Sequence, residues 1–229
     1  MAYPQKRLWT LIFLASLAGL LLIMLLSITL GPAGISLLEA LELILAKIPL
    51  LKGLVNPEQY PDTHHAIIYQ VRMPRVILAA LVGSALAATG TTFQGLVKNP
   101  MADPYVIGIS SGAALGASMA IVSGFSNVLG FGAVPLTAFG GALLSTLIVY
   151  NVARVGGKVP VFTLLLAGIA LSSFMSALMS LIMILNTREL QQIIFWMLGS
   201  FSGKKWSHVA VAAPVILAGI SGLWVFARD

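Results

Sequence analysis

Apolar residues in this chain are grouped in runs long enough to cross a bilayer, and polar stretches separate the runs. A transmembrane helix needs about 20 apolar residues, and by that rule the chain has about six spans. They are residues 8–30, 76–93, 106–122, 134–152, 161–185 and 208–227. A further apolar piece, 193–198, is too short to cross and is typical of an interfacial or re-entrant helix. The pattern predicts an all-α polytopic membrane protein with a single transmembrane domain over residues 1–229.

The connection between the first two runs, residues 36–70, has a different pattern. Its first part repeats apolar residues at helical spacing: Leu37, Leu41, Ile44 and Ile48. This spacing predicts an amphipathic helix that lies along the membrane surface. Residues 49–70 carry three prolines and two adjacent histidines, and we expect a loop there with the histidine pair in solvent.

Composition supports a membrane location. The chain is 59% hydrophobic and 9% charged, whereas soluble domains carry about 25% charged residues. The net charge of +6 fits loops that face anionic membrane lipid. No basic run interleaved with aromatic residues is present, so nucleic-acid binding is not expected. The absence of cysteine excludes disulfides and thiolate metal sites.

The charge pattern gives the orientation only weakly. The 13 basic residues divide almost evenly between the two sides of the predicted topology. Lys6 and Arg7 flank the first run, which is longer than the apolar region of a signal peptide. We therefore expect an uncleaved first span, a cytoplasmic N-terminus, and an extracytoplasmic segment at 36–70.

Small residues recur at positions where helices could approach closely. Gly108, Gly112 and Gly116 form two consecutive GxxxG steps, and Gly83 pairs with Ala87. In lipid, such residues let helix backbones pack together. The alternative is that small residues are simply common in membrane helices. Three methionines at 175, 179 and 183 repeat at helical spacing and predict either helix packing or a wall for a bulky ligand.

A polar, proline-containing break separates the second and third runs. Its candidate gate and pathway residues are Gln94, Asn99, Pro100, Met101, Asp103 and Pro104. Irregular backbone at membrane depth is tolerated only where it is buried in protein or lines water. The break is therefore either an aqueous loop or part of a gate, and its Asn and Asp can also cap the next helix.

Two arginines flank a Met-Pro pair at the start of the second run. Arg72 and Arg75 could dock carboxylates of a partner through bidentate contacts. The alternative is that their side chains snorkel to lipid headgroups.

The sequence lacks the residue patterns that several kinds of chemistry require. The sequence shows no catalytic triad, no metal-ligand cluster and no paired carboxylates, and it points to no cofactor. Residues 199–205 do not match a phosphate-binding loop, because three residues separate the glycines where four are required. From the second run onward His208 is the single ionisable residue in the spans. Ion-coupled carriers place such residues at mid-membrane, so energy from a partner is the simpler hypothesis, with a secondary carrier as the rival.

At these residues the chain resembles the FecCD/BtuC-like permease subunits of ABC importers for iron-siderophores, haem and vitamin B12. The resemblance is carried by five segments. They are the Arg-Met-Pro-Arg at 72–75, residues 83–94, residues 98–104 with the run Asn-Pro-Met-Ala-Asp-Pro, the glycine-rich 108–116, and residues 195–206, which contain Trp-Met-Leu-Gly-Ser. It covers nearly the whole chain.

The resemblance implies roles for these motifs. Arg72 and Arg75 match arginines that dock acidic residues of an extracytoplasmic substrate-binding protein, and Asn99 and Met101 match a cytoplasmic-side gate. It further implies a permease homodimer or heterodimer, a separate ABC ATPase subunit, a prokaryotic plasma (inner) membrane and a cytoplasmic N-terminus. The permease itself is then not an enzyme.

The chain departs from the family pattern in length. Family members have roughly ten helices, more than the six spans that the ~20-residue rule finds here. We therefore expect a truncated form of the permease bundle that ends before the loop that grips the ATPase. The expected cargo is a bulky metal chelate, with iron-siderophore ahead of haem and cobalamin. The alternatives are a non-transporting membrane fragment and one half of a split permease.

Overall fold

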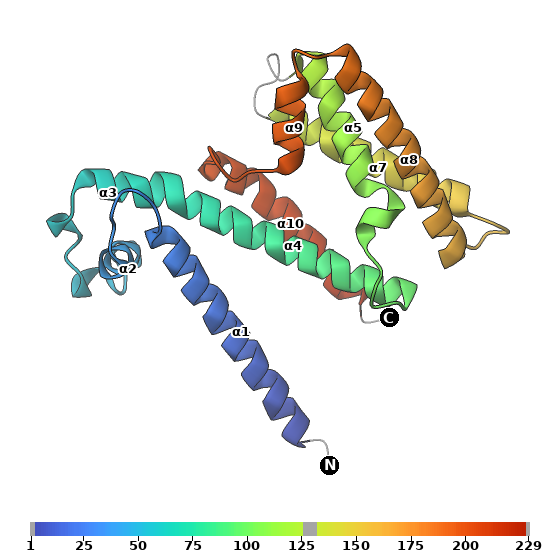
Figure 1. Cartoon of the computed structure of the whole chain (residues 1–229). Coiled ribbons are helices and arrows are strands. Elements are labelled where there is room, and N and C mark those ends of the chain that lie inside the picture. The colour runs from blue at the N-terminus through green and yellow to red at the C-terminus, as the bar shows by residue number, and fades with distance from the viewer. Residues whose placement is uncertain (1–2, 126–131, 228–229) are drawn as a thin grey trace. The chain divides into compact units, whose positions relative to one another are not determined.

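The computed structural model describes residues 3–125 and 132–227, and within these residues every regular element is a helix (Figure 1). The α-helices are α1 (Tyr3–Thr29), α2 (Leu37–Ala46), α3 (Asp62–Ala66), α4 (Met73–Val97), α5 (Ile109–Val122), α7 (Ala133–Ala153), α8 (Val161–Leu185), α9 (Leu190–Leu198) and α10 (Trp206–Phe226). Single turns of other types are η1 (Lys52–Leu54), η2 (Pro57–Gln59), the π-helical η3 (Ile67–Arg72) and η4 (Pro104–Ile107).

The helices agree with the predicted spans. In the described residues five helices are long and apolar enough to cross a membrane, and α5 is a shorter apolar helix. These six match the six predicted runs in order, so the all-α polytopic prediction is confirmed. The short apolar piece at 193–198 falls in α9, which is too short to span.

The loop predicted over residues 49–70 ends earlier than expected. Helical structure begins at Asp62 and continues through η3 into α4, so that an unbroken helical stretch covers 36 residues, Asp62–Val97. Pro61 precedes it in an extended conformation, φ −60° and ψ 143°. The loop prediction was therefore wrong beyond Pro61, because the prolines that break the helix end there.

The predicted helix exists as α2, and the face that it buries inside the chain is not the predicted apolar stripe. Ser36 caps its start by accepting the backbone N–H of Glu39 at 3.2 Å. Ala40 and Leu43 are fully buried, whereas Leu37 is 45% exposed. Inside the chain α2 packs on a neighbouring cluster with a face one residue away from the apolar stripe, through its smaller Ala40. Its placement along the membrane surface stays a prediction.

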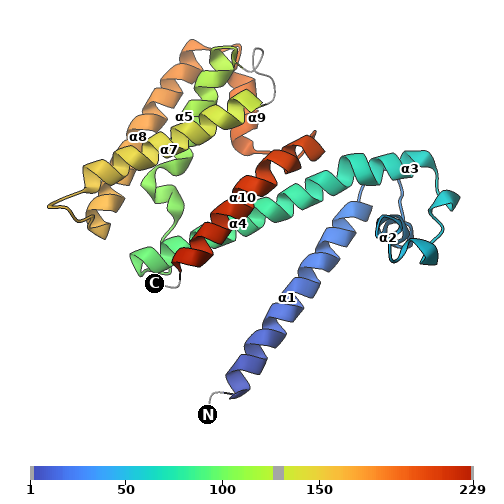
Figure 2. The same cartoon turned by 180° about the vertical axis from the view of Figure 1, so that it is seen from behind.

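The described chain forms two compact units, residues 1–86 with 201–229 and residues 87–200. The core of the first unit joins the end of α1, α2 and η3 through five buried residues: Ile28, Ile35, Ala40, Leu43 and Ile68. In the second unit α5 packs most extensively on α7 and also contacts α8 and α9 (Figures 1 and 2). Its core includes Ile121, Met179 and Ile193, so Met179 serves helix packing.

Glycines allow the close approach of α5 to α7. A Cβ on Gly112 would lie 2.5 Å from the Gly141 carbonyl oxygen and 2.6 Å from the Ser145 Cβ. A Cβ on Gly116 would overlap the Thr137 carbonyl. Backbone therefore meets backbone along this seam, which is how helices associate in lipid without a hydrophobic driving force.

A polar network covers the apolar cluster of the first unit. The Nδ1 atom of His64 lies 2.5 Å from Oε1 of Glu39, whose side chain is 9% exposed. Glu42 accepts hydrogen bonds from Gln59 at 2.8 Å and from Tyr60 at 3.0 Å. Partial burial raises the pKa of the Tyr60 hydroxyl and the Glu42 hydrogen bond raises it further, so Tyr60 remains a donor to Glu42 at neutral pH.

The two histidines are both part of this fold. His65 Nε2 lies 2.9 Å from the Pro57 carbonyl oxygen, and His64 pairs with Glu39 as described. The prediction of a solvated pair was wrong because α2 supplies a carboxylate that the linear sequence does not place nearby. Among the described residues there is no group of three or more potential metal ligands.

We expect the His64–Glu39 pair to stabilise the first unit. His64→Ala leaves a buried carboxylate without its partner and should lower the free energy of unfolding by about 1–3 kcal/mol. The measurement is unfolding in detergent micelles, followed by circular dichroism. Glu58→Ala removes an exposed carboxylate nearby and is the control. Equal stability of the two variants would contradict the stabilising role.

The α5–α7 seam gives a second prediction. Gly112→Ala introduces a Cβ where backbone and Ser145 leave no space, and overpacking of this kind costs about 1–3 kcal/mol. Gly140→Ala, with nothing within 4 Å of the added Cβ, is the matched control. Thermal unfolding in micelles should show a lower midpoint for Gly112→Ala alone. Indistinguishable midpoints would mean that the helices can separate without loss.

Candidate functional site

The first candidate docking residue, Arg72, lies in the interior of the first unit. Its side chain is 9% exposed. Nη1 donates to the Ile28 carbonyl oxygen at 2.6 Å and to the Thr29 carbonyl oxygen at 2.8 Å. These carbonyls end α1 and have no partner within that helix. A Cβ on Gly31 would lie 2.6 Å from Nη2 of Arg72. Arg72 therefore caps the C-terminus of α1.

The second candidate docking residue, Arg75, is half-buried in the first turn of α4. It lines a groove of about 570 Å³ between α1 and α4, whose other lining residues are almost all apolar or small. Its Nε atom is buried and has no hydrogen-bond partner. Arg72 and Arg75 therefore differ in environment, because the Arg72 guanidinium binds backbone while Arg75 keeps an unused donor.

The polar break begins with a regular helix end. Lys98 adopts a left-handed conformation, φ 53°, and its N–H bonds to the Gly95 carbonyl at 3.3 Å. The Asn99 N–H bonds to the Gln94 carbonyl at 3.1 Å. These two bonds form a Schellman motif that closes α4. Half-buried Gln94 thus supplies a carbonyl that ends the helix. Pro100, which follows Asn99, is exposed.

Side chains satisfy the backbone through the remainder of the break. Asn99 Oδ1 accepts the Met101 N–H at 2.9 Å, and Asp103 Oδ1 accepts the Tyr105 N–H at 2.8 Å. Asp103 is the N-cap of η4, which Pro104 begins. The predicted capping by Asp103 is confirmed. The Met101 side chain is 87% exposed, so it is not packed into the core of the second unit.

The third run is divided at Gly108. Its φ of 83° places it in the left-handed region, where it ends η4 and precedes α5. Ser145 Oγ of α7 donates to the Gly108 carbonyl at 2.7 Å. Ser172 Oγ of α8 is also buried and has no hydrogen-bond partner among the described residues. Two hydroxyls therefore gather at a helix break, and the linear sequence gave no signal for Ser145.

The glycines of the third run lie together, whereas Gly83 is separate from them. Gly108, Gly112 and Gly116 all face α7 closely enough that a Cβ would clash. No atom lies within 4 Å of a Cβ built on Gly83, which lines the groove beside Arg75.

A concave surface in the second unit carries methionine and serine. It encloses about 430 Å³ between α8 and α9 and includes Met179, Met183 and Met197 together with Ser176 and Ser180. Thioether and hydroxyl groups of this kind offer an adaptable, weakly polar wall. The predicted methionine stripe therefore contributes both to the core and to this surface.

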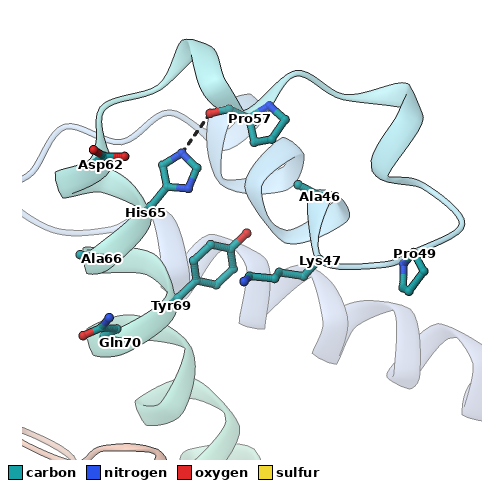
Figure 3. Close-up of a pocket in the computed structure, with 9 residues that line it drawn as sticks. All are labelled: Ala46, Lys47, Pro49, Pro57, Asp62, His65, Ala66, Tyr69 and Gln70. Atoms are coloured by element: carbon teal, nitrogen blue, oxygen red, sulfur yellow. Dashed lines mark hydrogen bonds between the residues drawn. The ribbon is translucent and has the colours of Figure 1, made fainter.

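A larger hollow, of about 650 Å³, lies in the first unit between α2, the loop and α3 with η3 (Figure 3). The Lys47 ammonium lies 4.9 Å from the centre of the Tyr69 ring, and Figure 3 shows both side chains at the wall. His65 is fixed there by the Pro57 carbonyl. None of the predicted docking or gate residues lines this hollow.

Comparison of the sequence with known proteins identifies relatives of this chain. A profile of the FecCD transport family matches residues 19–229. The chain is 39% identical over 169 residues to the cobalamin import system permease protein BtuC of Halobacterium salinarum, an alignment that covers 74% of this chain and 45% of that protein. It is 42% identical over 147 residues to a protein from Helicobacter pylori named as a probable iron chelatin transport system permease protein. That alignment covers 64% of this chain and 43% of the Helicobacter pylori protein.

A solved structure has the same helical arrangement. It is described as a metal-chelate type ABC transporter in an inward-facing conformation. Its TM-score to this chain is 0.67 at 26% identity, and the match covers 90% of this chain and 57% of the other. The chain spans less than half the length of the curated relatives above. The family match covers most of its residues, and the chain therefore belongs to the FecCD transport family, whose members are multi-pass permease components of ABC transporters.

Proposed function

We propose that this chain is the transmembrane permease component of an ATP-driven importer for a bulky metal chelate. The observation that carries the proposal is that its relatives are named for cobalamin and iron chelatin, both bulky metal chelates. Iron-siderophore is the leading cargo, and haem and cobalamin follow. The weakly polar Met and Ser surface on α8 and α9 suits a large ligand without charge selection.

The proposed importer needs separate partners for energy, for delivery of the cargo and for completion of the path. The five long apolar helices contain few ionisable residues, which favours energy from a separate ABC ATPase subunit over ion coupling. An extracytoplasmic binding protein would deliver the cargo, and a second permease chain, identical or different, would complete the path. The permease itself is not an enzyme in this scheme.

The mechanism follows from the two ends of α4. The binding protein docks where α4 begins, on the outer face of a prokaryotic plasma (inner) membrane. Arg75 makes the docking contact, and Arg72, bound to the carbonyls that end α1, supports the turn beside it. Cargo leaves past residues 94–104, where α4 ends, and the N-terminus lies in the cytoplasm. A 25-residue helix is about 37 Å long, enough to connect the two faces.

Uptake in a permease-null strain that retains its ATPase and binding protein tests the function. We expect this chain, expressed together with the C-terminal half of a family member, to restore uptake of labelled iron-siderophore. Cells that express only the C-terminal half are the control, with haem and cobalamin as competing cargoes. Uptake abolished by collapse of the ion gradient but unaffected by ATP depletion would instead indicate a secondary carrier.

Charge reversal tests the docking role. We expect Arg75→Glu to weaken binding-protein affinity at least about tenfold and to flatten its salt dependence, because a charge pair is replaced by like charges. Arg188→Glu alters an exposed arginine between α8 and α9 and is the matched control. In the double variant Arg72→Glu/Arg75→Glu, the loss of the α1 cap should also lower stability. Unchanged affinity in the double variant would remove the docking role.

A further inference from the structure

The π-helical turn η3, Ile67–Arg72, leaves one backbone carbonyl without a donor. In this turn hydrogen bonds reach five residues back, and the Met73 N–H bonds to the Ile68 carbonyl. The next donor in that register would be residue 74, and its acceptor would be the Tyr69 carbonyl. Residue 74 is proline, which has no N–H. The Tyr69 carbonyl therefore needs a partner from outside the helix.

A tryptophan 137 positions away supplies that partner. The Trp206 indole Nε1–H donates to the Tyr69 carbonyl oxygen at 2.7 Å. Trp206 is the first residue of α10 and belongs to the same compact unit as Tyr69. The tryptophan indole carries a single donor, which in partly buried sites usually has a partner.

The same turn ends at Arg72 and leads into the first turn of α4, which holds Arg75, the second arginine of the candidate docking site. Arg72, the last residue of η3, binds the carbonyls that end α1. Arg75 lies one turn further along and keeps its unpaired Nε. Three segments distant in sequence, the end of α1, η3 and the start of α10, are thus joined through backbone carbonyls by two side chains.

We propose that the Trp206 indole replaces the backbone donor that Pro74 removes. This hydrogen bond, called the latch below, holds η3 at the N-terminus of α10 and thereby orients Arg75, which follows η3 along the chain. Without it, the Tyr69 carbonyl is left unpaired in a turn that already lacks one hydrogen bond. The turn then opens more often, and Arg75 no longer has one orientation. The consequence for docking rests on the function proposed above, whereas the latch itself does not.

A double-mutant cycle tests the latch in the full chain in lipid nanodiscs. The readout is hydrogen exchange of peptides covering residues 67–78, measured by mass spectrometry. Trp206→Phe keeps an aromatic ring but removes the donor, and we expect about tenfold faster exchange. Pro74→Ala restores a backbone N–H at residue 74. In that background Trp206→Phe should change exchange by no more than about twofold.

The control is Trp9→Phe, which alters a tryptophan on α1 that is 70% exposed and should leave exchange in these peptides unchanged. Exchange in Trp206→Phe equal to the wild type would overturn the latch, because water would then serve the carbonyl equally well. An equal increase from Trp206→Phe with and without Pro74→Ala would also overturn it, because the indole would then act through packing alone.

Binding-protein affinity tests the positioning consequence separately. We expect Trp206→Phe to weaken affinity and Pro74→Ala to rescue it in the double variant, a recovery that loss of ring packing would not produce. Weakening by Arg75→Glu but not by Trp206→Phe would overturn the positioning role. If neither variant changed affinity, the proposed docking function would fail, while the exchange data would still report on the latch.

Discussion

The need to pair every backbone polar group away from water governs the irregular parts of this structure. Regular helices meet that need internally, but each interruption creates carbonyls or N–H groups without a partner. Here side chains donate hydrogen bonds to the unpaired carbonyls. Arg72 donates to the end of α1, Trp206 donates to the π-helical turn before α4, and Ser145 donates to the Gly108 carbonyl at the break before α5. These contacts come from distant sequence positions, so they also fix how the elements of each unit meet.

Backbone pairing and close packing are linked in the second unit. Gly108 can take its left-handed conformation because it has no Cβ, and the same absence leaves space for Ser145. Gly112 and Gly116 then carry the close approach along α7. In lipid the energy of such contacts comes from dispersion and hydrogen bonding at short range. A seam of backbone contacts is therefore sensitive to single methyl groups, whereas the exposed outer faces are not.

The first unit is built differently. Its long helices α1 and α10 are little buried inside the described chain, at 6% of the apolar stretch of each. Order is concentrated where α1, α2 and η3 meet, in the apolar cluster and in the Glu39–His64 and Glu42–Tyr60 contacts above it. The two arginines of the Arg-Met-Pro-Arg motif divide their roles there. Arg72 donates its hydrogen bonds to backbone carbonyls, and Arg75 retains an unpaired donor in an apolar groove.

The sequence by itself determined the class of the protein, the order of its spans and the cap at Asp103, because run length, proline and capping residues act locally. It also indicated the glycine seam, since GxxxG spacing places small residues on one helix face. Only the tertiary structure decided which face of α2 is buried, where His64 finds its partner, and that Arg72 caps α1. Ser145 and Trp206 likewise gave no local signal, because their acceptor carbonyls lie 37 and 137 residues away. Such pairings are set by how helices pack, and a linear pattern of apolar residues does not contain that information.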